Sequence, residues 1–235
     1  MTVRRGGRTP FDPAFEQLPE AMPIFPLSGA LLLPGGRLPL NIFEPRYLTM
    51  VLDSLAGHRL IGMVQPMKAG GYAGGGVAVG DGPPPIHAIG CAGRIVQFAE
   101  TEDGRLLITL AGVTRFEAGQ ELPLHHNGYR RVMTHFERFR PDLDHADELI
   151  ELDRSRMMAA LHTYFRGHQL TTDWKAVQDA GDRNLVTSLS MVLPFGPAEK
   201  QALLEASNST ARARLLIALL EMEGRSEDGG NTSRH

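Results

Sequence analysis

Short apolar runs, broken by glycine and proline, characterise the chain from Met22 to about Phe139. Leu106, Ile108 and Leu110 follow the two-residue period that places side chains on one face of a strand. A Glu-Asp-Gly turn at 102–104 predicts a hairpin between two such runs. The runs that favour strands are 23–27, 30–34, 37–42, 60–64, 86–100, 105–111, 113–120 and 129–136.

One helix is predicted to interrupt this series of strands. Pro45 suits the first position of a helix, and Gly57 suits the residue that ends it. The apolar side chains expected on its one buried face are Tyr47, Leu48, Val51, Leu52 and Leu55. Six or so short strands with one inserted helix imply a small, strongly curved sheet or partial barrel.

The pattern changes to helical periods between Asp144 and Glu223, where four helices are expected. The second is opened by Asp182 and stopped at Pro194, the third begins at Pro197, and the fourth runs from about Asn208 to Glu223, with Gly224 at its end. The side chains expected to face inward are Ile150, Met157, Leu161 and Tyr164 on the first helix, Leu185, Val186, Leu189, Val192 and Leu193 on the second, and Ala211, Leu215, Leu219 and Met222 on the fourth.

The fold class predicted from these patterns is α+β, a barrel-like sheet followed by a helical bundle. We expect a flexible arm at 1–21, a barrel subdomain at 22–140, a helical subdomain at 141–223 and a flexible tail at 224–235. Residues 70–82 hold seven glycines. A phosphate-binding loop needs a helix after it, which Pro83 to Pro85 oppose, so this segment is interpreted as a surface loop.

The charge and cysteine content restrict the classes of function. The 24 basic and 27 acidic residues leave a formal charge of −3, so nucleic acid is not the expected partner. Cys91 is the single cysteine, which excludes an internal disulfide. The apolar stretches are too short to cross a bilayer, and no apolar signal-peptide core follows the basic start of the chain. We therefore expect a cytoplasmic protein.

Residue patterns for catalysis or metal binding are incomplete. His87 and Cys91 would share a strand face, but they supply two zinc ligands where three or four are needed. The chain contains no Gly-Lys pair, and Ser28 lies in neither a nucleophile elbow nor a Ser-x-x-Lys pair. We therefore expect no enzyme activity, no metal and no cofactor. The arginines that could form a cationic edge near Phe136 and Phe139 are Arg130, Arg131, Arg138 and Arg140, and carboxylates lie among them.

Three segments, in order, carry a family resemblance. The sequence over 23–47, with Pro-Ile-Phe-Pro-Leu, Leu-Pro-Gly-Gly-Arg and Ile-Phe-Glu-Pro-Arg-Tyr, closely resembles the opening of the Lon N-terminal substrate-binding domain. Ile89–Ile95, the Asp103-Gly104 turn and Leu107–Phe116 match its middle, and Leu193–Glu205 resembles its closing bundle. The resemblance covers about residues 22–223.

This resemblance implies a PUA-like pseudo-barrel followed by a helical bundle. It also implies a non-catalytic module that binds unfolded protein or peptide segments, with a Lon-type protease as a further partner and a role in protein quality control. In full-length Lon proteases an ATPase domain and a Ser–Lys peptidase domain follow, and we expect neither here because the sequence ends at His235. Two alternatives stay open, an RNA- or nucleotide-binding module and a small-molecule pocket inside the barrel.

By the same resemblance, the partner-binding candidates are Phe43, Glu44, Arg46 and Tyr47, which match a segment implicated in substrate contact. Two aromatic rings beside a carboxylate and a guanidinium are typical of a peptide-binding patch. In the alternative interpretation, Phe43 and Tyr47 cover the barrel while Glu44 and Arg46 pair or cap the helix.

Overall fold

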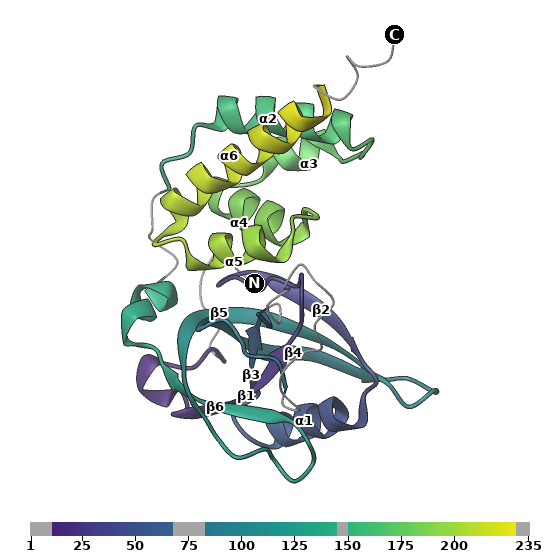
Figure 1. Cartoon of the computed structure of the whole chain (residues 1–235), viewed down its shortest axis with the longest axis vertical. Helices are drawn as coiled ribbons and strands as arrows, with labels where there is room; N and C mark the ends of the chain where they lie inside the picture. The colour runs from purple at the N-terminus through teal and green to yellow at the C-terminus, as the bar shows by residue number, and fades with distance from the viewer. Residues whose placement is uncertain (1–10, 68–82, 145–149, 229–235) are drawn as a thin grey trace, which may run out of the picture. The chain divides into compact units, whose positions relative to one another are not determined.

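The computed structural model describes residues 11–67, 83–144 and 150–228 (Figure 1). The chain divides into two compact units, Met1–Ala146 and Asp147–His235. Residues 1–10 of the arm predicted at 1–21, the glycine-rich segment at 70–82 and residues 229–235 of the tail predicted at 224–235 lie outside the described residues.

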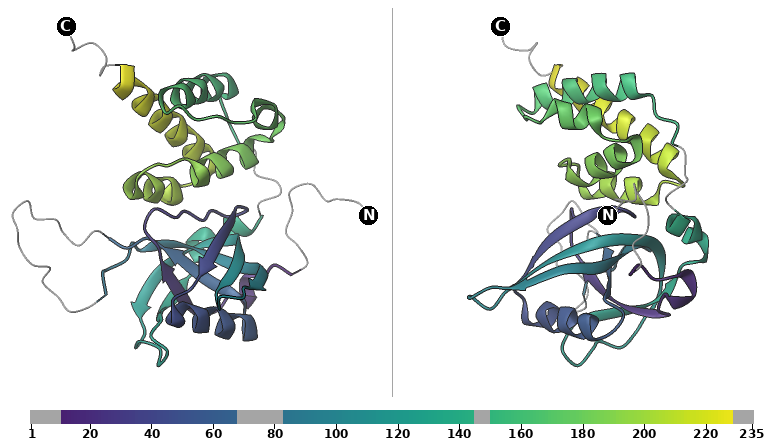
Figure 2. Two further views of the ribbon diagram at one scale, coloured as in Figure 1. Left: turned by 90° about the vertical axis from the view of Figure 1, so that its right-hand side faces the viewer. Right: turned by 180° about the vertical axis from the view of Figure 1, so that it is seen from behind.

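The first unit is built on a single curved sheet. The strands follow the order β2-β5-β4-β3-β1-β6, and β5 also pairs with β6, which closes the sheet into a barrel. Helix α1 packs against β1 and β3 (Figure 2). The elements are η1 (Phe15–Gln17), β1 (Ala21–Pro26), β2 (Arg37–Ile42), α1 (Pro45–Ala56), β3 (Leu60–Val64), β4 (Ile89–Glu100), β5 (Leu106–Glu121), β6 (Arg130–His135) and η2 (Glu137–Asp144).

Strand β5 changes its partner along its length. Its first part, 106–111, pairs with β2, and residues 117–121 pair with β6. On its other side it pairs with β4 from Leu106 to Glu117. The prediction of two strands at 105–111 and 113–120 is therefore wrong, because one strand of 16 residues covers both.

The strand predicted at 30–34 is also wrong. Residues 30–33 form a coil, and Leu31, Leu32 and Leu33 are all buried. The coil meets β5 at Gly112, whose N–H donates to the Gly36 carbonyl and whose own carbonyl accepts from the Gly35 N–H, both at 2.9 Å. The apolar run thus fills the core between the part of β5 that pairs with β2 and the part that pairs with β6.

Gly112 allows this close approach because it has no Cβ. A Cβ atom at this position would lie 2.0 Å from the Leu33 carbonyl oxygen, well inside any allowed contact. The oxygen belongs to the backbone, so it cannot move aside by a change of rotamer.

Part of the segment predicted as a flexible arm packs against the barrel. Phe15 and Leu18 lie against the hydrophobic core, and the Thr134 hydroxyl donates to the Pro19 carbonyl at 2.6 Å. Arg94 Nε donates to Asp12 Oδ1 at 2.9 Å. Residues 12–19 are therefore part of the folded unit.

A buried ion pair joins the middle of β5 to η2. Arg115 donates from Nε to Asp142 Oδ2 at 2.7 Å and from Nη2 to Oδ1 at 2.8 Å, and its guanidinium lies 4.5 Å from the centre of the Phe139 ring. Two parallel charge-assisted bonds fix both distance and orientation. They hold η2 against the barrel after β6 has ended.

The second unit consists of helices in its described residues. Helix α6 packs against α2, α4 and α5. Asp153 caps α2 by accepting from the Arg156 N–H at 2.9 Å. The elements are α2 (Arg154–Gly167), α3 (Trp174–Asp179), α4 (Asp182–Val192), α5 (Pro197–Glu205) and α6 (Ser209–Asp228), of which α3 was not predicted.

Several predicted inward positions are wrong by about one residue of helical phase. Met222 and Val192 are exposed, and Ile150 precedes α2. On α1, Leu52 is exposed while Met50 is buried. The buried apolar residues of α6 are Ala213, Leu216, Ile217 and Leu220.

Gly224 does not end α6, because the helix continues to Asp228. A Cβ atom on Gly224 would lie 3.0 Å from the Thr163 methyl group of α2. The glycine therefore allows two helices to approach closely. From the sequence alone, a glycine with this role cannot be distinguished from one that ends a helix.

A lysine is buried in the helical unit. Lys200 lies on α5, and its Nζ donates to the Met191 carbonyl near the C-terminal end of α4 at 3.4 Å. Burial lowers the pKa of Lys200 below its ordinary value of 10.5.

We expect Gly112→Ala to destabilise the barrel unit by at least about 1–3 kcal/mol, the usual cost of forcing an atom into a packed interior. Gly62→Ala is the matched control, because its Cβ would meet the Phe116 ring at 2.8 Å and a side chain can adjust. Each glycine variant is made in the unchanged protein and in the Phe116→Leu variant, and its stability is measured by denaturant unfolding. We expect Phe116→Leu to reduce the destabilisation caused by Gly62→Ala and to leave that caused by Gly112→Ala unchanged. An equal reduction for both would contradict the backbone contact.

The stability of the helical unit should depend on the protonation of Lys200. Its folded-state pKa is below its unfolded value, so folding disfavours the charged form and the buried ammonium lowers the stability of the unit. This destabilisation disappears as the pH rises toward 10.5, where the unfolded chain also loses the proton. The free energy of unfolding of Lys200→Met, measured relative to the unchanged protein by helical circular dichroism, should therefore decrease between pH 7 and about 10.5. The exposed Lys175→Met serves as control, and a gap for Lys200→Met that stays constant over this range would contradict the expectation.

Candidate functional site

The predicted binding segment lies where β2 passes into α1. Pro45 is in the first turn of α1, as predicted, and the Glu44 carbonyl accepts from the Tyr47 and Leu48 N–H groups at 2.9 Å. The Glu44 side chain makes no capping hydrogen bond. Of the two aromatic rings, Phe43 is 61% exposed and Tyr47 only 7%.

Tyr47 packs between helix α1 and the sheet face that the helix covers. Its ring centre lies 4.3 Å from that of Phe25 on β1, and the Arg46 guanidinium lies over the Tyr47 ring, 4.5 Å from its centre. Burial raises the pKa of the Tyr47 hydroxyl, with nearby Arg46 opposing that shift. The residue therefore offers little surface to a partner.

Glu44 and Arg46 form an ion pair with each other. Arg46 donates from Nη2 and Nε to Glu44 Oε2 at 2.7 and 2.9 Å, and both side chains are partly exposed. A surface pair of this kind contributes little to stability. The structure thus separates the four candidates into a buried ring, a surface ion pair and one exposed ring.

The loop between β5 and β6 lies beside α1. The Tyr129 hydroxyl donates to Asp53 Oδ2 at 2.9 Å, and the site of a Cβ on Gly128 is 3.7 Å from Arg46 Cβ. Burial, aided by the hydrogen bond to Asp53, raises the pKa of Tyr129 to about 12. This bond ties the helix that begins at the candidate segment to the barrel.

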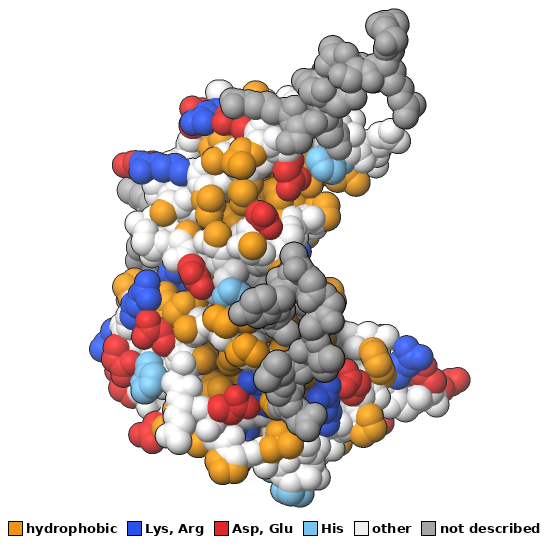
Figure 3. All heavy atoms as spheres, viewed as in Figure 1, with side chains coloured by type: hydrophobic (Ala, Val, Ile, Leu, Met, Phe, Trp, Pro, Cys, Tyr) orange, Lys and Arg blue, Asp and Glu red, His pale blue; other side chains and the backbone are white. Residues whose placement is uncertain are grey.

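Phe43 also meets the hairpin between β4 and β5. The Arg105 guanidinium lies 5.8 Å from the centre of the Phe43 ring. Arg105 forms an ion pair with Asp103 at 2.8 Å in the hairpin turn. Charged side chains of both signs gather at this projecting tip, with hydrophobic side chains beside them (Figure 3).

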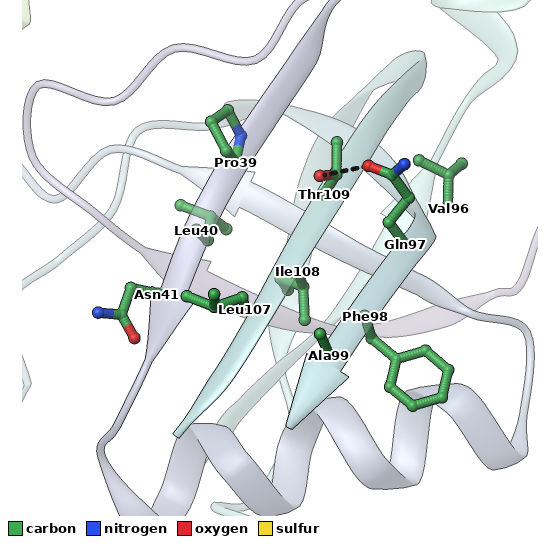
Figure 4. Close-up of a pocket in the computed structure, with 10 residues that line it drawn as sticks. All are labelled: Pro39, Leu40, Asn41, Val96, Gln97, Phe98, Ala99, Leu107, Ile108 and Thr109. Carbon is green, nitrogen blue, oxygen red and sulfur yellow. Dashed lines mark hydrogen bonds between the residues drawn. The ribbon is translucent and has the colours of Figure 1, made fainter. Parts of the chain in front are cut away.

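An open groove of about 850 Å³ lies on β2, β5 and β4 (Figure 4). Two of its large apolar side chains are exposed, Phe98 by 56% and Leu107 by 47%. Thr109 donates to Gln97 Oε1 at 3.1 Å on the groove surface. The lining residues are Pro39, Leu40, Asn41, Val96, Gln97, Phe98, Ala99, Leu107, Ile108 and Thr109.

Phe43 lies at one end of this groove. The β2–β5 pairing brings Asn41 opposite Leu107 and ends at Ile42 opposite Leu106, so Phe43 is one residue beyond the last pair. The exposed Phe43 ring therefore continues the sheet face that carries Leu107, whereas Phe98, paired with Ile108, is directed to the opposite face. The groove itself was not predicted. A signal for it was present, because Leu107 lies between the inward positions Leu106 and Ile108 and therefore places an apolar side chain on the outward face of the strand.

The structure does not favour the two alternatives to peptide binding. Three of the four arginines of the predicted cationic edge form ion pairs, Arg130 with Glu121, Arg138 with Glu117 and Arg140 with Glu16. Within the barrel, core side chains such as the fully buried Phe116 fill the interior, and the groove lies on its outer surface.

The described residues contain no group of three or more His, Cys, Asp or Glu side chains placed to hold a metal ion. None of the helices within 11–67, 83–144 and 150–228 combines the length and the apolar character needed to cross a membrane.

The barrel and the following helices define a PUA-like α+β fold, as solved structures confirm. The Lon N-terminal domain protein from Xanthomonas campestris aligns over 84% of this chain and 97% of its own, with a TM-score of 0.57 and 23% identity. The N-terminal domain of the Mycobacterium avium complex Lon protease aligns over 85% of this chain and 97% of its own, with a TM-score of 0.54 and 14% identity.

The family model of the ATP-dependent protease La (LON) substrate-binding domain matches residues 21–222, so the chain belongs to this family. The Lon protease of Desulfosudis oleivorans is 30% identical over 101 residues, which are 43% of this chain and 12% of that protein. The Lon protease of Syntrophus aciditrophicus is 24% identical over 214 residues, 87% of this chain and 25% of that protein. The chain thus spans a quarter or less of these relatives.

The two aromatic candidates should respond differently to truncation. Tyr47→Ala removes a buried ring and should destabilise the barrel unit by about 3–5 kcal/mol. Phe43→Ala removes an exposed ring and should change the free energy of unfolding by about 0.5 kcal/mol or less. Denaturant titration measures both, and Tyr47→Phe controls for the hydroxyl. Equal effects of the two alanine variants would contradict the difference in burial.

Proposed function

We propose that this chain is a non-catalytic module that holds unfolded or extended segments of other proteins. The observation that carries the proposal is the groove on β2, β5 and β4, which exposes apolar side chains. The chain belongs to the Lon substrate-binding family, so a bound protein segment is the proposed occupant of this groove. Holding is assigned to the chain because the matched family domain is the substrate-binding one. A Lon-type protease is the proposed second partner, in protein quality control.

The groove has the mixture expected of a peptide-binding surface. Leu107 and, at the end of the groove, Phe43 supply apolar contact, while Asn41, Gln97 and Thr109 add polar groups for orientation. The groove is open, so a long chain can enter and leave at both ends without a free terminus. Such a surface suits a binder of varied sequences.

Phe43 is the member of the predicted set that supports this role. Its exposed ring lies at the end of the groove and within reach of the Arg105 guanidinium. In the proposal Phe43 touches the bound segment, Glu44 and Arg46 form its charged border, and Tyr47 holds the junction in place from below.

Groove variants test this function. We expect the double variant Phe43→Ala/Leu107→Ala to bind a fluorescent unfolded protein, such as reduced and carboxymethylated lactalbumin, about tenfold or more weakly, as loss of central apolar contacts does at other interfaces. Fluorescence anisotropy gives the affinity. Leu124→Ala is the matched control, because Leu124 is as exposed as these residues and lies outside the groove.

Circular dichroism and unfolding titrations establish that each variant is folded. Unchanged binding by the folded double variant would reject the groove as the site. A lack of binding by the unchanged protein to any unfolded polypeptide would reject the proposed function as a whole.

A further inference from the structure

Strand β2 has one unpaired edge. It lies at the end of the sheet order and pairs only with β5 among the described strands. Its backbone groups on the other side are therefore not used by the sheet. An unpaired edge beside a groove is a place where another extended chain is able to add as a strand.

Alternate residues of β2 direct their backbone N–H and carbonyl groups toward β5, and the residues between them direct these groups to the free edge. The Gly112 N–H donates to the Gly36 carbonyl, so the backbone of Gly36 points toward β5. Antiparallel pairs alternate, which directs Leu38, Leu40 and Ile42 toward β5 as well and directs Arg37, Pro39 and Asn41 away from it.

The opposite side of β5 agrees with this phase. The Thr101 N–H donates to the Arg105 carbonyl, so Arg105 is directed toward β4. By alternation, the backbone N–H and carbonyl groups of Leu107 and Thr109 also point toward β4, and those of Leu106 and Ile108 point toward β2. The two strand pairs give the same assignment independently.

Pro39 fits an outward position. Proline has no N–H, so it is accepted where the sheet needs no donor, at an edge. The groups that remain along the edge are the N–H and carbonyl of Arg37, the carbonyl of Pro39, and the N–H and carbonyl of Asn41. Three residues normally have six such groups, and five are present here because only the proline N–H is missing.

The edge is continuous with the groove, since Pro39, Leu40 and Asn41 belong to both. Arg37, at one end, is exposed, and its side chain makes no hydrogen bond or ion pair with the part of the chain that the structure describes. Its charge is complementary to a carboxylate on an added strand.

We infer that the outer edge of β2 binds an extended, mainly apolar segment of another polypeptide by strand addition, with a carboxylate of that segment opposite Arg37. Backbone bonds to Arg37, Pro39 and Asn41 supply sequence-independent affinity, and side chains of the segment lie on the groove. The inference rests on the proposed function and adds the mode of recognition.

Backbone donors along the edge provide a test with effects of opposite sign. Pro39→Ala restores an outward N–H and should tighten peptide binding about two- to tenfold, the effect of one net hydrogen bond, although it removes apolar surface from the groove. Asn41→Pro removes an outward N–H and should weaken binding by a similar factor. Asn41→Ala keeps the N–H and is the matched control for the side chain.

The probes are ten-residue peptides that together cover β-casein, an unfolded polypeptide, and binding is measured by fluorescence anisotropy. The tightest binder is then synthesised with N-methyl groups on alternate amides, in each of the two possible phases. In strand addition one phase abolishes binding and the other is tolerated, because only alternate amides face the edge.

Each outcome separates the inference from the proposed function. Tighter binding by Pro39→Ala together with a phase-dependent effect of N-methylation supports strand addition. Binding that is insensitive to phase, or weakened by Pro39→Ala in a folded variant, overturns strand addition and leaves peptide binding by side chains. No binding of any casein peptide to the unchanged protein overturns both.

Discussion

The barrel depends on the contact between the Leu33 carbonyl and Gly112. At this point β5 stops pairing with β2 and turns toward β6, and the buried coil 31–33 fills the space between the two partners. The contact exists because Gly112 has no side chain. Closure of the sheet, the position of β2 at its edge and the outer groove all follow from this one change of partner.

The candidate segment joins a buried aromatic ring and an exposed one within five residues. Tyr47 and Phe25 anchor the start of α1 to the sheet face that this helix covers, and Phe43, four residues earlier, remains at the surface beside the hairpin. The two interpretations of this segment are therefore not exclusive. The buried part sets the position of the exposed part, as a rigid scaffold does for a binding residue.

Much of the fold was predictable because its signals are local. The uniformly apolar run 60–64, Pro45 at a helix start and the Asp103-Gly104 turn, where Gly104 has φ +78°, act within a few residues of themselves. The coil at 31–33 was not predictable in this way, because its apolar side chains are buried by contacts with β4 and β5, distant in sequence. Gly112 and Arg115 lie in the stretch Leu107–Phe116 that resembles the family, but their contacts with Leu33 and Asp142 became evident only in the structure.

The site was predictable only in part. Phe43 was named from its segment, but the groove needs the register of three strands, in which Leu107 faces Asn41 and Ala99. Pattern alone also could not distinguish Gly224 as a packing residue from a helix stop, since both uses favour glycine. In each case the missing information is a contact between elements far apart in the chain.

The Arg115–Asp142 ion pair has a consequence for making the barrel as a separate fragment. A piece that stops after β6 would keep the buried guanidinium and lose the carboxylate that binds it in two places. Loss of one member of such a pair commonly costs about 3–5 kcal/mol, comparable to the entire stability of many small domains. A recombinant barrel should therefore extend through η2 to be purified in folded form.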